Sequence, residues 1–107
     1  MTANFGDMLT KAKEMQKKMS EAQEVIKKIE VEGVSGGNLV KVRLTGDYEI
    51  KSIEISEEAK KEKREIINDL IIAAYNNAKD ELKKKSSEEL NKITGGLNLP
   101  FDLKLPF

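Results

Sequence analysis

The chain has 107 residues, the size of a single domain, and 36% of them are charged. Nineteen Lys and Arg residues balance nineteen Asp and Glu residues, so the net charge alone does not indicate a nucleic-acid partner. The absence of Cys and His removes the commonest metal ligands, the commonest general base and the best nucleophile. We therefore predict that the protein is not an enzyme, binds no cofactor or metal and has no small-molecule substrate.

Apolar segments are short throughout the sequence. No stretch approaches the ~20 apolar residues of a transmembrane helix, and residues 1–15 contain no run of signal-peptide length. We expect a soluble cytoplasmic protein without a membrane partner. Because the apolar residues are too few for a thick globular core, dimerisation is one way to complete it.

Apolar and small residues recur at alternating spacings of three and four in the first part of the chain. They are Phe5, Met8, Ala12, Met15, Met19, Ala22, Ile26 and Ile29. This is the a/d spacing of a heptad, which predicts one long amphipathic helix over residues 5–29 with a narrow apolar seam. Asn4 is a suitable N-cap for it. We expect the seam, including its methionines, to pack against one or two other helices.

Over residues 29–55 apolar and polar residues alternate, with interruptions at Gly36–Gly37 and Gly46–Asp47. Alternation over short runs separated by turn residues predicts three antiparallel strands. One face of the middle strand carries Val40, Val42 and Leu44. The phase of the alternation slips in the third strand, and a bulge near Lys51 would restore it.

Helical periodicity returns after residue 55. Ser56 is a suitable N-cap, and the acidic residues after it favour a short helical turn before the main helix. Residues 65–82 carry a broad apolar face, which we expect to cover the sheet. Residues 83–93 are helical by propensity, but their apolar residues are too few to predict burial. Gly95–Gly96 is a suitable C-terminal cap.

Residues 95–107 differ in composition from the rest of the chain, since they hold both prolines and two of the three phenylalanines. Pro100 and Pro106 keep the segment extended. Leucine or phenylalanine occupies every second position from 97 to 105, so one side could lie along an apolar groove of its own chain or of a partner. Because chain termini are usually loosely held, we expect disorder or loose packing in preference to a partner site. Residues 1–94 then form one domain and residues 95–107 its extended tail.

The predicted order of helix, three-stranded antiparallel meander, helix and tail defines an α+β fold. The first helix ends where the sheet begins, and the last helix starts where the sheet ends. Their other ends, both rich in lysine, therefore point away from the sheet. These two ends can lie side by side as a projecting arm.

Lysine clusters on this arm are the candidates for binding a polyanion. They comprise Lys11, Lys13, Lys17 and Lys18 in the first helix and Lys83, Lys84 and Lys85 in the last. A third basic cluster, residues 60–64, lies nearer the sheet. A solubilising helix face explains any one cluster, but the convergence of two on one arm favours nucleic acid. Since no aromatic residue lies between these lysines, they fit phosphate contacts with duplex DNA better than stacking on single-stranded bases.

Four segments of the chain carry a recognisable pattern. They are FGDMLTKAKEMQKKMSEAQ, VEGVSGGNLVKVRLTGDYEIKSIEI, INDLIIAAYNNA and GGLNLPFDLKLPF. In this order the segments resemble the YbaB/EbfC family of bacterial nucleoid-associated proteins over nearly the whole chain. The resemblance implies a small cytoplasmic homodimer whose helical arms project like tweezers from a core of sheets and helices. It also implies binding to double-stranded DNA at the nucleoid, with little sequence preference and a role in chromosome organisation or gene regulation.

The alternative function is a dimeric scaffold that docks partner proteins through its arms or its tail. The balanced charge and the apolar tail favour this alternative. A protein partner that is still recovered after nuclease treatment would support the scaffold, whereas loss of every partner with the nucleic acid would argue against it.

Overall fold

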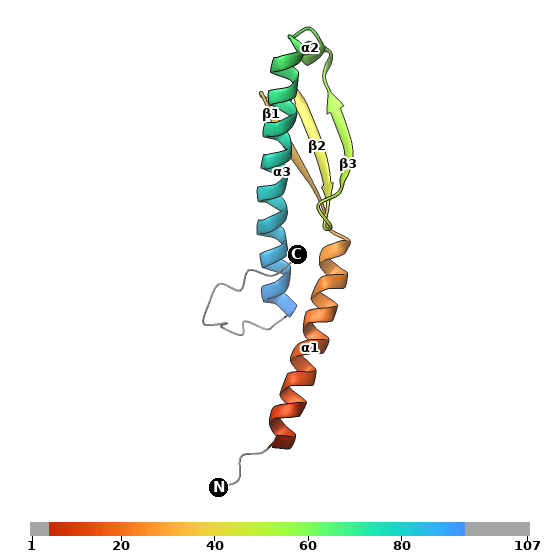
Figure 1. Cartoon of the computed structure of the whole chain (residues 1–107), viewed down its shortest axis with the longest axis vertical. Coiled ribbons are helices and arrows are strands. Elements are labelled where there is room, and N and C mark those ends of the chain that lie inside the picture. Colours follow the sequence, from red (N-terminus) through yellow and green to blue (C-terminus); the bar gives the residue numbers. More distant parts are fainter. Residues whose placement is uncertain (1–4, 94–107) are drawn as a thin grey trace.

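A computed structural model describes residues 5–93 of the chain as an elongated molecule of 73 × 22 × 17 Å (Figure 1). Its elements are α1 (Phe5–Lys27), β1 (Glu30–Ser35), β2 (Val40–Thr45), β3 (Ile50–Ile55), α2 (Glu57–Lys60) and α3 (Arg64–Ile93). The predicted α+β order, including the short helix before the last one, is confirmed. Asn4, Gly95–Gly96 and the tail, on which several predictions rest, lie outside the described residues.

The three strands form one antiparallel sheet in the order β1-β2-β3. Val40, Val42 and Leu44 are fully buried on the face that meets α3, as the alternation predicts. Between β2 and β3, Arg43 pairs with Ser52, whereas the next residue, Leu44, pairs with Ile50. Lys51 is therefore the additional residue of a β-bulge, which confirms the predicted bulge and explains the slip in phase.

Helix α3 lies on β1 and β2, and its backbone comes close to β1 at Gly33. A Cβ atom at this position would overlap with the backbone of Ala74 and Ala78, so only glycine permits this approach. Asn77 also covers the outer edge of β1, where its side-chain oxygen accepts a hydrogen bond of 3.0 Å from the Val34 amide. The first half of α3 is thereby held over one side of the sheet, away from β3.

The start of the helical region matches its sequence signals. The amide of Ala59 donates to the Ser56 hydroxyl at 3.1 Å, which confirms Ser56 as the N-cap of α2. Beyond the sheet, however, the expectation that residues 83–93 are too polar to be buried is wrong for one stripe. Ser86 and Leu90 are only 8% and 9% exposed. Residues four apart share one side of a helix, and here that side faces α1.

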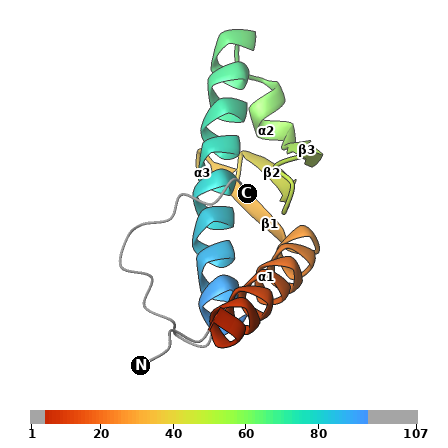
Figure 2. The same ribbon diagram turned by 60° about the horizontal axis from the view of Figure 1, so that its bottom comes forward.

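Helix α1 runs antiparallel to α3 and leaves the sheet at the turn between β2 and β3 (Figures 1 and 2). Its last turn is buried at Ala22 and Ile26. Gly46 of the turn lies so close to α1 that a Cβ atom would overlap with the Ile26 carbonyl. This contact between two backbones fixes where α1 departs from the sheet. The helix ends at Lys27, two residues before the end of the predicted seam, because β1 begins at Glu30.

Candidate nucleic-acid interface

We call α1 together with residues 82–93 of α3 the arm, and the sheet with the rest of α3 the base. Figures 1 and 2 show that the two helices of the arm lie next to each other at the end of the molecule away from α2. The inference from chain order, that the lysine-rich ends of the two helices form a projecting arm, agrees with this arrangement.

The four lysines of α1 are all exposed, but they do not share one side of the helix. Lys13 and Lys17 are four residues apart and lie on the side opposite the seam, because each residue turns the helix by about 100°. Lys11 and Lys18 are seven residues apart and lie beside the seam. Within residues 5–93 none of the four forms an ion pair with a carboxylate. They are thus free to meet an anion.

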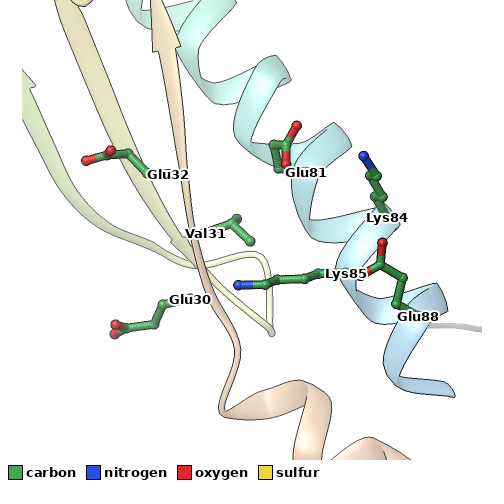
Figure 3. Close-up of a pocket in the computed structure, with 7 residues that line it drawn as sticks. All are labelled: Glu30, Val31, Glu32, Glu81, Lys84, Lys85 and Glu88. Carbon is green, nitrogen blue, oxygen red and sulfur yellow. The ribbon is translucent and has the colours of Figure 1, made fainter. Parts of the chain in front are cut away.

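The three consecutive lysines of α3 point in different directions, since neighbours on a helix are about 100° apart. Lys84 and Lys85 line a hollow between α3 and β1, whereas Lys83 does not (Figure 3). The other charged residues of this hollow are Glu30, Glu32, Glu81 and Glu88. Figure 3 shows the Lys85 side chain directed towards β1, whereas the Glu30 and Glu32 side chains point away from α3.

The charges around this hollow are balanced. Lys51 donates a hydrogen bond to the Glu30 carboxylate and, by its charge as well, holds the pKa of Glu30 below its ordinary value. Arg43 lies 3.9 Å from the Glu32 carboxylate across the strand pair. Lys51 and Arg43 thus balance Glu30 and Glu32, and Lys84 and Lys85 equal Glu81 and Glu88 in number. This region therefore does not concentrate positive charge.

The third basic cluster, residues 60–64, lies around α2 at the opposite end of the molecule from the arm (Figure 1). One of its members, Lys60, is 3.0 Å from the Glu57 carboxylate. The structure thus separates this cluster from the arm lysines along the long axis of the protein.

Other kinds of site find little support in the described part of the chain. Residues 5–93 contain no group of three or more carboxylates suited to a metal ion. Neither of the two long helices in that range is apolar enough to cross a membrane.

The sequence analysis did not single out one apolar surface next to the sheet. Ile50 and Ile53 of β3 lie on the face that meets α3, yet they are 49% and 43% exposed because α3 covers β1 and β2 instead. Ile72 of α3 is also 59% exposed, but it lies about 200° around the helix from Ala74, which is buried against the sheet, and so it points away from the sheet. We call Ile50 and Ile53 the isoleucine surface.

Comparison with known proteins agrees with a site for DNA on this fold. The model of the YbaB/EbfC DNA-binding family matches residues 1–97. A nucleoid-associated protein of Granulibacter bethesdensis is 39% identical over 105 residues, which cover 97% of this chain and 98% of that protein. The chain belongs to the YbaB/EbfC DNA-binding family.

Proposed function

We propose that the protein is a homodimeric, nucleoid-associated DNA-binding protein of the cytoplasm that contacts duplex phosphates with lysines on its helical arms. Its role is to organise the chromosome or regulate genes. Membership of a DNA-binding family and similarity to a protein named nucleoid-associated support this function. The observation that carries the mechanism is the group of four exposed lysines around the projecting helix α1, none of them in an ion pair within residues 5–93.

Low sequence specificity follows from the kind of contact available. Phosphate contacts fix the position of a protein on a duplex but carry no sequence information by themselves. Lys13 and Lys17 lie on successive turns of α1 on the side opposite the seam, and Lys17 also lines a groove with Ile93 of α3. Lys11 and Lys18 extend this positive surface around one side of the helix. The lysines of α3 remain candidates, and Lys84 and Lys85 contribute less because carboxylates line the same hollow.

A second copy of the chain is the proposed partner of the isoleucine surface. β3 is an edge strand of the sheet, with its apolar face open beside α3. Covering Ile50 and Ile53 with the same surface of another protomer would remove two exposed isoleucines from water. Each is expected to contribute on the order of 1 kcal/mol, since about half of its side chain is already buried. The dimer would then carry two arms.

A salt titration of DNA binding tests the phosphate contacts. With about four to six contacted phosphates, the logarithm of the binding constant should fall against the logarithm of salt concentration with a slope of about −4 to −5. Changing Lys11, Lys13, Lys17 and Lys18 together to Ala should weaken binding to all duplex sequences alike. Binding that does not respond to salt would exclude phosphate contacts as its source.

Two double variants with equal net charge show which lysines contribute to the affinity for DNA. Lys13→Gln with Lys17→Gln should weaken binding and reduce the salt slope by about one for each lost contact. Lys84→Gln with Lys85→Gln removes the same charge from the balanced hollow and should have the smaller effect. Equal losses of affinity would show that overall charge, and not the outer side of α1, determines binding.

The dimer is tested by the molar mass in solution. The protein should have the mass of two chains in light scattering at micromolar concentration. Ile53→Glu should shift it towards one chain, because it places a charge in the buried interface. Ser52→Glu is the matched control, since its side chain points to the opposite face of β3. A monomeric wild-type protein would overturn the proposed interface.

A further inference from the structure

The apolar seam of α1 is buried near the sheet and exposed at the far end of the arm. Ala22 is fully buried. Phe5, Met8 and Leu9, in contrast, are 74%, 62% and 60% exposed, and Ala12 is exposed as well. Since each residue turns the helix by about 100°, these four side chains lie within an arc of about 100°. We call Phe5, Met8, Leu9 and Ala12 the exposed stripe.

Charged residues are sorted by sign around the exposed stripe. Lys11 and Lys13 border it, one on each side, at about 110° and 90° from its centre. Leu9 widens the stripe beyond the seam and so brings Lys13 to its edge. Asp7 and Glu14 lie at about 150° and 170°, on the opposite side of the helix. Because both lysines are exposed and neither is in an ion pair within residues 5–93, a surface that meets the stripe also meets two lysines available to an anion.

This arrangement has the chemistry of a helix that lies on a lipid surface. Such a helix carries one apolar side and lysines towards its polar face. Its apolar side chains enter the boundary between headgroups and acyl chains, while the lysine stems lie along that boundary and their ammonium groups reach lipid phosphates. The acidic side of α1 would then face water. A DNA duplex, by contrast, offers phosphates but no apolar layer for Phe5 or Leu9.

The position of the exposed stripe leaves room for a flat surface. Figure 1 shows the first turns of α1 beyond the end of α3 and far from the sheet, at one end of the 73 Å axis of the molecule. Four apolar residues are too few for a stable protein–protein interface, which buries roughly 800 Å² per partner. A fluid lipid surface needs no complementary shape, so a few side chains are enough for reversible binding.

We infer that the tip of the arm binds the surface of an anionic phospholipid membrane, with the exposed stripe beneath the headgroups and Lys11 and Lys13 at lipid phosphates. The expectation of no membrane partner rested on the lack of a spanning segment. A helix that lies on a membrane needs none, and neither long helix within residues 5–93 is apolar enough to span one. This contact does not require DNA.

A single tryptophan tests which side of α1 meets lipid, because the chain has no tryptophan of its own. Leu9→Trp places the probe on the exposed stripe, and Thr10→Trp, the matched control, places it about 150° from the centre of the stripe. Each full-length variant is mixed with vesicles of phosphatidylcholine and phosphatidylglycerol in equal parts. The emission of Leu9→Trp should shift to shorter wavelength, and that of Thr10→Trp should not. Equal shifts, or no shift in either variant, would overturn the inference.

Flotation with the same vesicles measures the contribution of the stripe. Leu9→Gln should lower the fraction bound about tenfold, because a leucine side chain gains by leaving water. Ile72→Gln is its matched control, since Ile72 is 59% exposed in the base and lies far from the tip. Both variants should keep the urea midpoint of the wild-type protein. Equal losses of binding would mean that apolar surface anywhere on the molecule attaches to lipid, which contradicts a site at the tip.

The lysines are tested by the charge of the lipid. Vesicles of phosphatidylcholine alone should bind the wild-type protein about tenfold more weakly than the anionic vesicles. Lys11→Gln with Lys13→Gln should remove most of this difference. Lys61→Gln with Lys63→Gln removes the same charge at the other end of the molecule and should leave the difference in place. Equal binding to neutral and anionic vesicles would exclude lipid phosphates as partners of the two lysines.

A second copy of the chain is the competing occupant of the exposed stripe. It would shift the emission of Leu9→Trp as the protein concentration rises in the absence of vesicles. The emission should instead be independent of protein concentration until anionic vesicles are added. A shift that needs no lipid would overturn the proposed membrane contact.

Discussion

The base and the arm are stabilised in different ways, although α3 runs through both. In the base α3 lies on a sheet whose central strand is fully buried at Val40, Val42 and Leu44, and its backbone contacts that of β1 at Gly33. In the arm the same helix still contacts the sheet at Leu82, but beyond it the buried residues, Ser86 and Leu90, form a single line facing α1. The seam of α1 is open to solvent at its far end. Burial decreases steadily from the sheet to the tip.

This difference separates stability from binding. The base holds the buried residues that stabilise the fold, whereas the lysines proposed to contact DNA are exposed on α1 and contribute little to stability. Substitutions of arm lysines should therefore change DNA binding with little effect on unfolding. Substitutions in the base should lower the free energy of unfolding with little effect on DNA binding as long as the protein stays folded. Binding should be lost only when the substitution unfolds the protein.

The largest effect is expected where the base is most tightly packed. Gly33→Val places a branched side chain against the backbone of Ala74 and Ala78, which cannot move without separating α3 from β1. The free energy of unfolding should fall by more than about 2 kcal/mol, measured by urea denaturation. Gly6→Ala is the control, because a Cβ atom at Gly6 meets no neighbouring atom. It should stabilise α1 by about 0.5–1 kcal/mol, and a loss as large as that of Gly33→Val would contradict the difference in packing.

The same substitution, leucine to alanine, can be made in the base and in the arm to compare their contributions to stability. Leu44→Ala, in the base, should lower the free energy of unfolding by about 2–5 kcal/mol, since the side chain is fully buried. Leu90→Ala, in the arm, should cost about 1–2 kcal/mol, because two helices can close around a small gap more easily than a sheet can. In hydrogen exchange the first change should affect all elements, and the second only α1 and the end of α3. A larger cost at Leu90 would mean that the arm, not the base, limits stability.

The smallest effect is expected on the exposed face of the sheet, at the pair formed by Lys51 and Glu30. Lys51 lowers the pKa of Glu30, so the pair stabilises the fold at pH values above the ordinary pKa of a glutamate. This contribution is lost as the pH falls through the lowered pKa in the folded state. Lys51→Gln should therefore lower the urea midpoint slightly at pH 7 and not at pH 2, while Lys51→Arg should preserve it. A difference that persists at pH 2 would show that charge is not its cause.

Local periodicity was sufficient to predict the elements and their buried faces. The heptad spacing of α1 identified a helix that packs on another helix, and the alternation in β2 identified Val40, Val42 and Leu44 as core residues. The slip in phase identified the bulge at Lys51, because side chains in a strand must alternate. These features depend on residues close together in the chain.

Features that depend on how α3 lies across the sheet could not be predicted in this way. The exposure of Ile53 results from the contact at Gly33, which holds α3 over β1 and β2, and no local pattern encodes that choice. The balanced surroundings of Lys84 likewise arise from glutamates on β1, more than fifty residues away in sequence. The different directions of three consecutive lysines, by contrast, follow from helix geometry alone and were open to prediction.

The close contact between Gly46 and the Ile26 carbonyl holds α1 at its sheet end, so a change in the angle of α1 at this contact moves its far end the most. Phe5 lies roughly 30 Å along the helix from this contact. A rotation of only about 5° at the contact would therefore displace the tip by nearly 3 Å, and Lys11 and Lys13 by roughly 2 Å. In a dimer the two α1 helices would move together, and the distance between the lysines of the two arms would change by up to twice that amount. In such a dimer, the gap available to a duplex would therefore depend on a contact at Gly46, which lies away from the proposed DNA-binding lysines.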